Sequence, residues 1–353
     1  MRVGVLTGGG DAPGLNAAIR AVGRRAVRND NVVIGIHNGW AGLTGDGDFR
    51  EMPRNEFSGI LSQGGTVLGS SRTNPLKREG GLDEVLQNVK RAELDALVAI
   101  GGDDTLSVAA WLAEHGGPVV GVPKTMDNDL SGTDYCIGFD TAVERVCEAI
   151  DRLHTTAASH HRVMVLEVMG RDTGWVALMG GIAGGADIIL IPEVPTSIDS
   201  IAHRLHMRLS GGRDFSIITV AEGFEMEGVT DKDDVAGKRD AFGHVQLSER
   251  SVGETIASLL EDRMGVETRT TVLGHTQRGG SPSAYDRIWA TRVGSAAYDL
   301  VLEGRWGMMP VVQHGGVETA RIADVAGKQR TVPKELYELA MQFGEDARKV
   351  ARV

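Results

Sequence analysis

The stretch RVGVLTGGGDAPGLNAAIR, residues 2–20, joins a short apolar run to three consecutive glycines and then to a segment of helical period. The run Arg2–Leu6 predicts a strand, and the apolar positions from Leu15 to Ala26 recur at the spacing of one helix face. Glycines between a strand and a helix can bring backbone N–H groups to the positive end of that helix, where phosphate binds. The stretch therefore predicts the start of an α/β fold, with either a plain turn or a phosphate site at Gly8–Gly10.

The glycines match neither of two common phosphate-binding fingerprints. The dinucleotide pattern needs a third glycine where this chain has Pro13. The P-loop pattern needs Lys and then Ser or Thr after Gly14, but Leu15 and Asn16 follow it.

Apolar runs and helical segments continue to alternate along the chain. The expected strands are Arg2–Leu6, Val32–Ile36, Asp95–Ile100, Val119–Val122, Val163–Val168, Ile188–Ile191, Phe215–Val220 and Thr270–Leu273. Besides the first helix, the expected helices are Leu82–Leu94, Ser107–His115, one from about Thr141, Trp175–Ala183, Ile201–Leu209, Ser251–Met264, Ser283–Leu302 and one near Lys334–Phe343. This alternation predicts an α/β fold with mainly parallel sheets covered by helices on both faces. Ligands of such sheets bind beyond the carboxyl ends of the strands, so the loops after strands are the candidate sites.

Composition limits the class of protein. The chain has 353 residues, of which 41% are apolar, so it can bury a sizeable core in two domains or one large one. No run of about 18 apolar residues occurs, so we expect no transmembrane helix. A net charge of −11 argues against nucleic acid as a partner. The 48 glycines, with only 10 prolines, indicate many tight turns or close backbone approaches.

The cysteines and histidines give no sign of a disulfide framework or a metal cage. Cys136 and Cys147 are the only cysteines and are expected to be free thiols, as in a cytoplasmic enzyme. No CxxC or HExxH spacing occurs, and the adjacent His160 and His161 suit a polar loop better than joint ligation. The polar stretch 225–249, which contains the run Asp231–Asp234, is expected to be a surface insertion.

Two further loops after strands carry carboxylates. Gly101–Thr105 reads GGDDT, in which a carboxylate can hold Mg²⁺ against phosphate oxygens, or Asp and Thr can cap the next helix. Lys124–Asp129 reads KTMDND, in which two carboxylates can divide the roles of base and orienting group, or form an Asx-rich turn. Taken alone, each loop leaves both readings open.

Taken together, the motifs resemble those of the 6-phosphofructokinase family. GGGDAPGLNAAIR, GGDDT, PKTMDND, MGRDTGW, AEGF and LGHTQRGGSP occur in this order between Gly4 and about Tyr298. The resemblance implies glycolytic, Mg²⁺-assisted phosphoryl transfer to the 1-hydroxyl of fructose 6-phosphate in a phosphofructokinase-like α/β fold. It also implies an active site in the cleft between two three-layer domains. One, of residues 1–137 with 277–328, would bind the phosphoryl donor, and the other, of 138–276 with 329–353, would bind fructose 6-phosphate.

The resemblance also implies a role for each matching residue. Asp127 is the expected base, flanked by Thr125 and Asp129, with Arg171 near the transferred group. The remaining expected contacts are Asp103 to Mg²⁺; Gly10, Arg72, Gly102, Asp104, Thr105 and Lys124 to the donor; and Met169, Gly170, Glu222, Arg162, Arg269, His275 and Arg278 to the sugar phosphate. Arg162 and Arg269 would reach the site of a neighbouring subunit, which implies a homo-oligomer, either dimer or tetramer. Such a cluster of arginines suits anionic substrates in an acidic protein.

Asp104 and Lys124 together resemble the pyrophosphate-dependent branch, because the ATP-using pattern has glycine at these two positions. Some ATP-using members carry the lysine, so Asp104 distinguishes the two branches better than Lys124 does. An aspartate at 104 would fill the space of the α-phosphate and repel it, at a cost of about 1–4 kcal/mol. A mere Asp104–Lys124 ion pair without a role in donor choice is the simpler alternative.

Alternatives at the level of function are an ATP-dependent phosphofructokinase, a sedoheptulose 7-phosphate kinase, a protein related to NAD or lipid kinases, and a non-catalytic sugar-phosphate sensor. The motifs MGR and GHTQRGG argue against the NAD- or lipid-kinase class, and the intact Asp103, Asp127 and Arg171 argue against the sensor. Of the arginines at the family's effector site, Arg20 and Arg24 match, but His154 stands where another is expected. We therefore expect little or no allosteric regulation.

Overall fold

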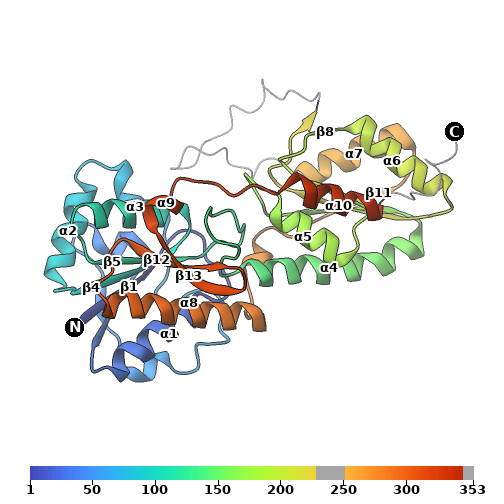
Figure 1. Ribbon diagram of the computed structural model, residues 1–353. Coiled ribbons are helices and arrows are strands. Elements are labelled where there is room, and N and C mark those ends of the chain that lie inside the picture. The colour runs from blue at the N-terminus through green and yellow to red at the C-terminus, as the bar shows by residue number, and fades with distance from the viewer. Residues whose placement is uncertain (228–250, 345–353) are drawn as a thin grey trace. The chain divides into compact units, whose positions relative to one another are not determined.

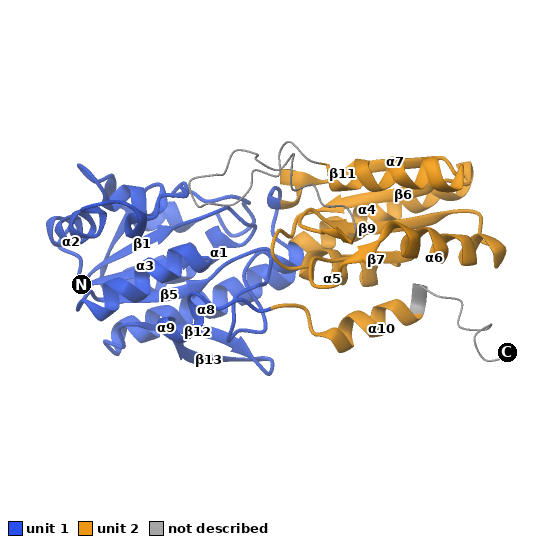
Figure 2. Ribbon diagram, turned by 90° about the horizontal axis from the view of Figure 1, so that it is seen from above, with its two compact units in different colours: residues 1–141, 278–330 blue, residues 142–277, 331–353 orange. Residues whose placement is uncertain are grey.

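A computed structural model describes residues 1–227 and 251–344. These residues form two compact units, Met1–Thr141 with Arg278–Arg330 and Ala142–Gln277 with Thr331–Val353 (Figure 2). Of the expected insertion 225–249, only the first three residues are described, and Asp231–Asp234 lie outside the described residues.

The first unit is built on a five-stranded sheet of order β3-β2-β1-β4-β5. Its strands β1, β4 and β5 are labelled in Figure 1. Its strands are β1 (Arg2–Thr7), β2 (Val32–Ile36), β3 (Phe49–Glu51), β4 (Ala96–Gly101) and β5 (Val119–Pro123). All neighbours are parallel except β2 and β3, which are antiparallel. Strands β1, β4 and β5 are buried almost throughout, which explains why their sequences are continuous apolar runs.

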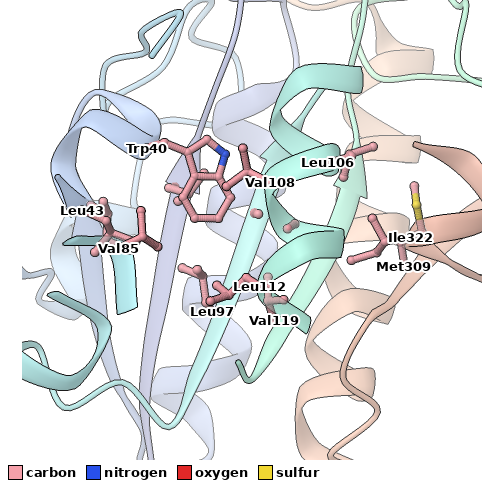
Figure 3. Close-up of a cluster of buried hydrophobic side chains, with 14 of the residues drawn as sticks. Trp40, Leu43, Val85, Leu97, Leu106, Val108, Leu112, Val119, Met309 and Ile322 are labelled. Atoms are coloured by element: carbon pink, nitrogen blue, oxygen red, sulfur yellow. The ribbon is translucent and has the colours of Figure 1, made fainter. Parts of the chain in front are cut away.

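Helices cover both faces of this sheet. The helices are α1 (Leu15–Arg28), α2 (Gly81–Arg91), α3 (Asp103–Glu114), α8 (Ala284–Leu302) and α9 (Ile322–Val325), with short 3₁₀ turns η1 (Gly39–Leu43), η2 (Arg54–Phe57) and η3 (Pro75–Lys77). Helices α1 and α8 pack closely side by side. Glycine at position 294 permits this, since a Cβ there would lie only 2.8 Å from the Ala18 carbonyl oxygen. On the other face, Trp40, Val85, Leu97 and Leu112 belong to one apolar core (Figure 3). An antiparallel pair, β12 (Met308–Gln313) and β13 (Gly316–Arg321), completes the unit.

The second unit contains a four-stranded, fully parallel sheet of order β11-β6-β9-β7. Its elements are β6 (Val163–Val168), β7 (Ile188–Leu190), β9 (Ser216–Ala221), β11 (Thr268–Val272), α5 (Trp175–Gly184), α6 (Ile198–Ser210), α7 (Val252–Met264), η5 (Gly274–Arg278), α10 (Lys334–Gly344) and the short pair β8 (Thr196–Ser197) and β10 (Met226–Glu227). Helix α4 (Phe139–His160) begins in the first unit and continues into the second. Val165, Ile218 and Leu205 share a core with residues of α7.

The predicted α/β class with mainly parallel sheets is confirmed, and most predicted elements are present with ends shifted by a few residues. The differences have physical causes. The strands β3 and β13 were not predicted, because β3 is short and both are largely exposed. The strand β12 was missed although it is mostly buried, because Pro310 interrupts its apolar run. The edge strand β11 begins at Thr268, two residues before the predicted start, because its polar residues TRT hide it from a hydrophobicity pattern. The prediction of a loop at His160 and His161 was wrong for His160, which is the last residue of α4. His161 lies just beyond the helix, with φ 55°.

No helix among the described residues is both long enough and apolar enough to cross a membrane. Within the same residues, no group of three or more His, Cys, Asp and Glu side chains is placed to hold a metal ion.

Candidate active site

The glycine loop after β1 is closely packed: a side chain at Gly8 would collide with Thr105, and one at Gly10 would displace the guanidinium of Arg278. A Cβ at Gly8 would lie 2.4 Å from Thr105 Oγ1, and one at Gly10 would lie 2.7 Å from a guanidinium nitrogen of Arg278. Gly9 has φ +78°, in the left-handed region that favours glycine. The loop therefore needs its glycines, and it brings the predicted donor residues Gly10 and Thr105 together with Arg278.

The loop has fewer backbone N–H groups available to bind an anion than the sequence suggested. The N–H of Gly8 donates to the Ile100 carbonyl at 3.0 Å, and that of Gly9 donates to the Ser71 carbonyl at 3.0 Å. These two groups hold the loop to the strand and segment beside it. The anion-binding character of the loop therefore rests more on side-chain cations than the backbone-cradle hypothesis assumed.

Lys124 supplies one of these cations from the end of β5. The residue is buried, and its ammonium Nζ donates to the carbonyl oxygens of Gly8 at 3.1 Å and Gly10 at 2.5 Å. Burial and the nearby positive charge of Arg278 lower the pKa of Lys124 to about 8, although the carboxylates of Asp11 and Asp127 act in the opposite direction. Arg278 donates to the Asp11 carbonyl at 3.0 Å, so both cations are fixed to the glycine loop.

The start of α3 places two carboxylates in different surroundings. Asp103 Oδ1 accepts a hydrogen bond from the N–H of Gly327 at 2.6 Å, and Asp104 Oδ1 accepts one from Asn74 Nδ2 at 2.9 Å. The helix cap is Gly102, which has no side chain, so the alternative that Asp or Thr caps this helix is wrong. Both carboxylates nevertheless lie in the first turn, where the helix dipole favours negative charge.

The alternative of an Asp104–Lys124 ion pair is also wrong. Lys124 binds the glycine-loop carbonyls, whereas the cation nearest to Asp104 is Lys77, with Nζ 3.8 Å from Oδ1. Asp104 and Lys124, the two residues that differ between the donor branches, are therefore held by separate partners.

Asp103 at the start of α3 is the residue that would hold a Mg²⁺ ion. Proteins commonly hold Mg²⁺ through one or two carboxylates together with substrate phosphates, so a closed cage of protein ligands is not required. Burial, followed by the adjacent charge of Asp104, raises the pKa of Asp103, while the Gly327 N–H opposes this. A bound cation would relieve the same penalty on the charged carboxylate.

The loop after β5 is fixed by its asparagine. Asn128 is buried with φ 53°; its Oδ1 accepts from the N–H of Cys136 at 2.9 Å. The N–H of Asp127 donates to Thr125 Oγ1 at 3.2 Å, which is a local turn of the kind expected for such a sequence. Asp127 and Asp129 flank the anchored Asn128 and are partly exposed. The turn and a catalytic role are thus compatible, because the turn is what fixes the two carboxylates.

In the second unit, the loops after β6 and β9 meet. The N–H of Gly223 donates to the Gly170 carbonyl at 3.0 Å, and Gly170 has φ +136°. The N–H of Met169 donates at 2.7 Å to Oε1 of Gln277, a fully buried side chain in η5. The predicted sugar contacts Met169, Gly170, Arg171 and Glu222 are therefore on adjoining loops.

Arg162 and Arg269 come together at the paired strands β6 and β11. Arg162 Nη2 lies 2.7 Å and Arg269 Nη2 lies 2.6 Å from the same oxygen, Oε1 of Glu267. The two guanidinium groups, Arg162 first, lower the pKa of Glu267. The structure thus joins two of the arginines predicted to bind one phosphate.

The other predicted site residues are placed as follows. His275 is exposed in η5, and Arg72 is exposed next to Ser71. Arg278, predicted to bind the sugar phosphate, is the first residue of the returning segment of the first unit, and its guanidinium lies against Gly10. The structure adds Asn74, Lys77, Asn128, Glu267 and Gln277, to which the sequence reasoning gave no role.

Comparison with known proteins agrees with the predicted family. A family model described as "Phosphofructokinase" matches residues 2–301. A pyrophosphate–fructose 6-phosphate 1-phosphotransferase of Amycolatopsis mediterranei is 50% identical over 97% of this chain and 99% of its own length. An ATP-dependent 6-phosphofructokinase of Streptomyces coelicolor is 45% identical over 96% of this chain and 98% of its own.

Solved structures agree as well. The chain matches phosphofructokinase from Saccharomyces cerevisiae with a TM-score of 0.78 and 32% identity, over 92% of this chain and 44% of that one. The family model covers most of the chain, and both relatives match nearly end to end. The chain therefore belongs to the phosphofructokinase family.

Proposed function

We propose that the protein transfers a phosphoryl group reversibly from pyrophosphate to the 1-hydroxyl of fructose 6-phosphate, giving fructose 1,6-bisphosphate. The choice of donor rests mainly on the presence of Asp104 at the position where ATP-using members have glycine. Its carboxylate is held at the start of α3. Lys124 supports it with a buried ammonium at the glycine loop. The relatives named above include one user of each donor, and the more similar of the two carries the pyrophosphate name.

In this proposal, the first unit binds the donor and supplies the base. Gly10, Arg72, Gly102, Thr105 and Lys124 hold pyrophosphate, and Arg278 adds positive charge beside Gly10. Asp127 accepts the proton of the sugar hydroxyl, with Thr125 and Asp129 on either side of it. Mg²⁺ bound through Asp103 would neutralise charge on the phosphate oxygens.

The second unit binds the sugar phosphate. Met169, Gly170 and Glu222 contact the sugar, and Arg171 lies near the transferred group. The 6-phosphate is bound by Arg162, Arg269, His275 and Arg278. Arg162 and Arg269 serve the site of a neighbouring copy, so the active form is a homo-oligomer. Phosphoryl transfer depends mainly on such positioning and charge neutralisation.

The second candidate is the ATP-dependent reaction, which the name of the Streptomyces relative favours. Substitution of Asp104 distinguishes the two. We expect Asp104→Gly to lower kcat/KM for pyrophosphate and raise it for ATP, because the change removes a side chain and a negative charge from the space of the α-phosphate. The shift in the ratio of the two should be about tenfold or more, given a charge effect of about 1–4 kcal/mol.

The matched control is Asp324→Gly, at an exposed aspartate of helix α9 in the same unit. The double variant Asp104→Gly, Lys124→Gly should shift the preference further. An unchanged donor ratio in both Asp104 variants would contradict the role assigned to this residue.

The charge of Lys124 gives a prediction for pH. Its pKa is about 8 in the folded protein against 10.5 as its ordinary value, so the ammonium loses its proton as pH rises through 8. We therefore expect KM for the anionic donor to rise above pH 8. Lys124→Met should have a higher KM at all pH values but lack this alkaline increase, because the titrating group is gone. An equal rise of KM above pH 8 in wild type and Lys124→Met would show that Lys124 is not the titrating group.

The same pKa shift also determines whether Lys124 makes folding stability rise or fall with pH. Between about pH 8 and 10.5 the unfolded chain binds the Lys124 proton and the folded chain does not, so this residue makes stability rise with pH in that window. The free energy of unfolding can be measured with urea at pH 7.5 and at pH 9.5. The change in this free energy from pH 7.5 to pH 9.5 should be more positive for wild type than for Lys124→Met.

A further inference from the structure

The segment 70–77 contacts both of the loops that we propose to bind the donor. At one end, the N–H of Gly9 donates to the Ser71 carbonyl at 3.0 Å, and Ser70 Oγ donates to the Gly9 carbonyl at 2.5 Å. At the other end, Asn74 and Lys77 approach Asp104. This segment is therefore fixed relative to the glycine loop and can fix the carboxylate in turn.

Asn74 is itself oriented by a helix cap. Its Oδ1 accepts a hydrogen bond from the N–H of Leu76 at 3.0 Å and so caps the 3₁₀ turn η3, in which Pro75 is the first residue. With the amide oxygen engaged in this way, the amide Nδ2 faces Asp104 and donates to its Oδ1 at 2.9 Å. One short side chain thus joins the local turn to a carboxylate 30 residues away.

The Asp104 carboxylate needs such a partner. Its side chain is 47% exposed and lies in the first turn of α3, so packing alone does not select one rotamer. Lys77 Nζ stands 3.8 Å from the same oxygen, beyond hydrogen-bond length, and is 46% exposed, so solvent screens this ion pair. The amide of Asn74 is the contact with hydrogen-bond geometry.

We propose that Asn74 is a positioning residue for donor specificity, which holds the Asp104 carboxylate in the orientation that excludes an α-phosphate. This inference rests on the proposed function, because it deepens the role given there to Asp104. Without the amide donor, the carboxylate can turn toward solvent, and a nucleotide then meets less repulsion. Pyrophosphate has no α-phosphate beyond its two groups, so its use depends little on this orientation.

The test is a double-mutant cycle read as a ratio of donor specificities. The variants are Asn74→Ser, Asp104→Gly and the pair, each assayed for kcat/KM with pyrophosphate and with MgATP at saturating fructose 6-phosphate. Serine is chosen because it still caps η3, so the turn is retained while the contact with Asp104 is lost. Asn55→Ser, at an exposed asparagine of the same unit, is the matched control.

We expect Asn74→Ser to lower the pyrophosphate-to-ATP ratio about fivefold, the effect of one hydrogen bond to a partly exposed charged group. The kcat with pyrophosphate should stay within about twofold of wild type. In the Asp104→Gly background the same substitution should leave the ratio unchanged, because the group that Asn74 positions is absent. A structural role alone would lower both activities together without moving the ratio.

Two failures are distinguishable. If wild type prefers ATP, the proposed donor is wrong whatever Asn74 does. If wild type prefers pyrophosphate but Asn74→Ser keeps the ratio, or shifts it equally in the Asp104→Gly background, the positioning role of Asn74 is overturned and the proposed function stands.

Discussion

Asp127→Ser is expected to lower kcat by about two to four powers of ten, the usual contribution of a general base. The carboxylate lies on a loop that Thr125 and the buried Asn128 hold in place, so the substitution removes the base and leaves the loop's anchors. Serine is small and polar, and the sugar-binding residues belong to other loops. Fructose 6-phosphate should therefore still bind, with an affinity measured by calorimetry close to that of wild type.

Asp324→Ser, at an exposed carboxylate of the same unit, is the control and should keep wild-type turnover. If Asp127→Ser retained kcat within about tenfold of wild type, the group that accepts the proton would have to be another one. Loss of sugar binding together with turnover would instead indicate that Asp127 mainly binds the substrate.

Asp286→Ala is expected to cause the largest loss of stability. This carboxylate is fully buried in α8 and accepts hydrogen bonds from Tyr135 Oη, the N–H of Gly138 at 2.6 Å, and the N–H and Oγ1 of Thr141 at 2.8 and 2.5 Å. Burial raises the pKa of Asp286, and these donors act against that shift. Alanine would leave the donors buried without their acceptor, at a cost of about 3–5 kcal/mol. The network also joins α8 to the start of α4.

Thermal unfolding measures this effect against Asp299→Ala in the same helix. Asp299 forms a partly exposed ion pair with Arg25 at 2.6 Å, and its loss should cost less than about 1 kcal/mol. If Asp286→Ala does not fold, Asp286→Asn, which keeps an acceptor oxygen, should fold with an intermediate melting temperature. Equal melting temperatures for Asp286→Asn and Asp299→Ala would contradict the importance of the network.

The sequence allowed the sheets and their candidate loops to be predicted because the central strands are buried on both faces. Strands β4 and β9 are buried at every position, so the sequence of β4 is apolar throughout and that of β9 is apolar except for Ser216 and Thr219. The edge strand β11 carries a weaker signal. Its first residues, Thr268 and Arg269, are polar, so the pattern predicted only the later part of the strand and its pairing with β6 shows the rest.

The sequence motifs allowed candidate site residues to be proposed, but they did not indicate the residues that hold those candidates in place. Asn74 reaches Asp104 and Gly327 reaches Asp103 across 30 and 224 positions of the chain, and no local pattern reports such a contact. Gln277 lies in a quoted motif, yet its bond to Met169 follows only from the fold. The placement of Arg278 against Gly10 has the same cause, because residues 278–330 return to the first unit.

The choice of donor is the central claim, and one comparison tests it most directly. Formation of fructose 1,6-bisphosphate should be measured at a fixed concentration of fructose 6-phosphate with Mg²⁺ and either pyrophosphate or ATP as the donor. We predict rapid turnover with pyrophosphate and a kcat/KM for ATP lower by about tenfold or more, as the repulsion by Asp104 requires. Efficient turnover with MgATP and poor turnover with pyrophosphate would contradict the proposed function.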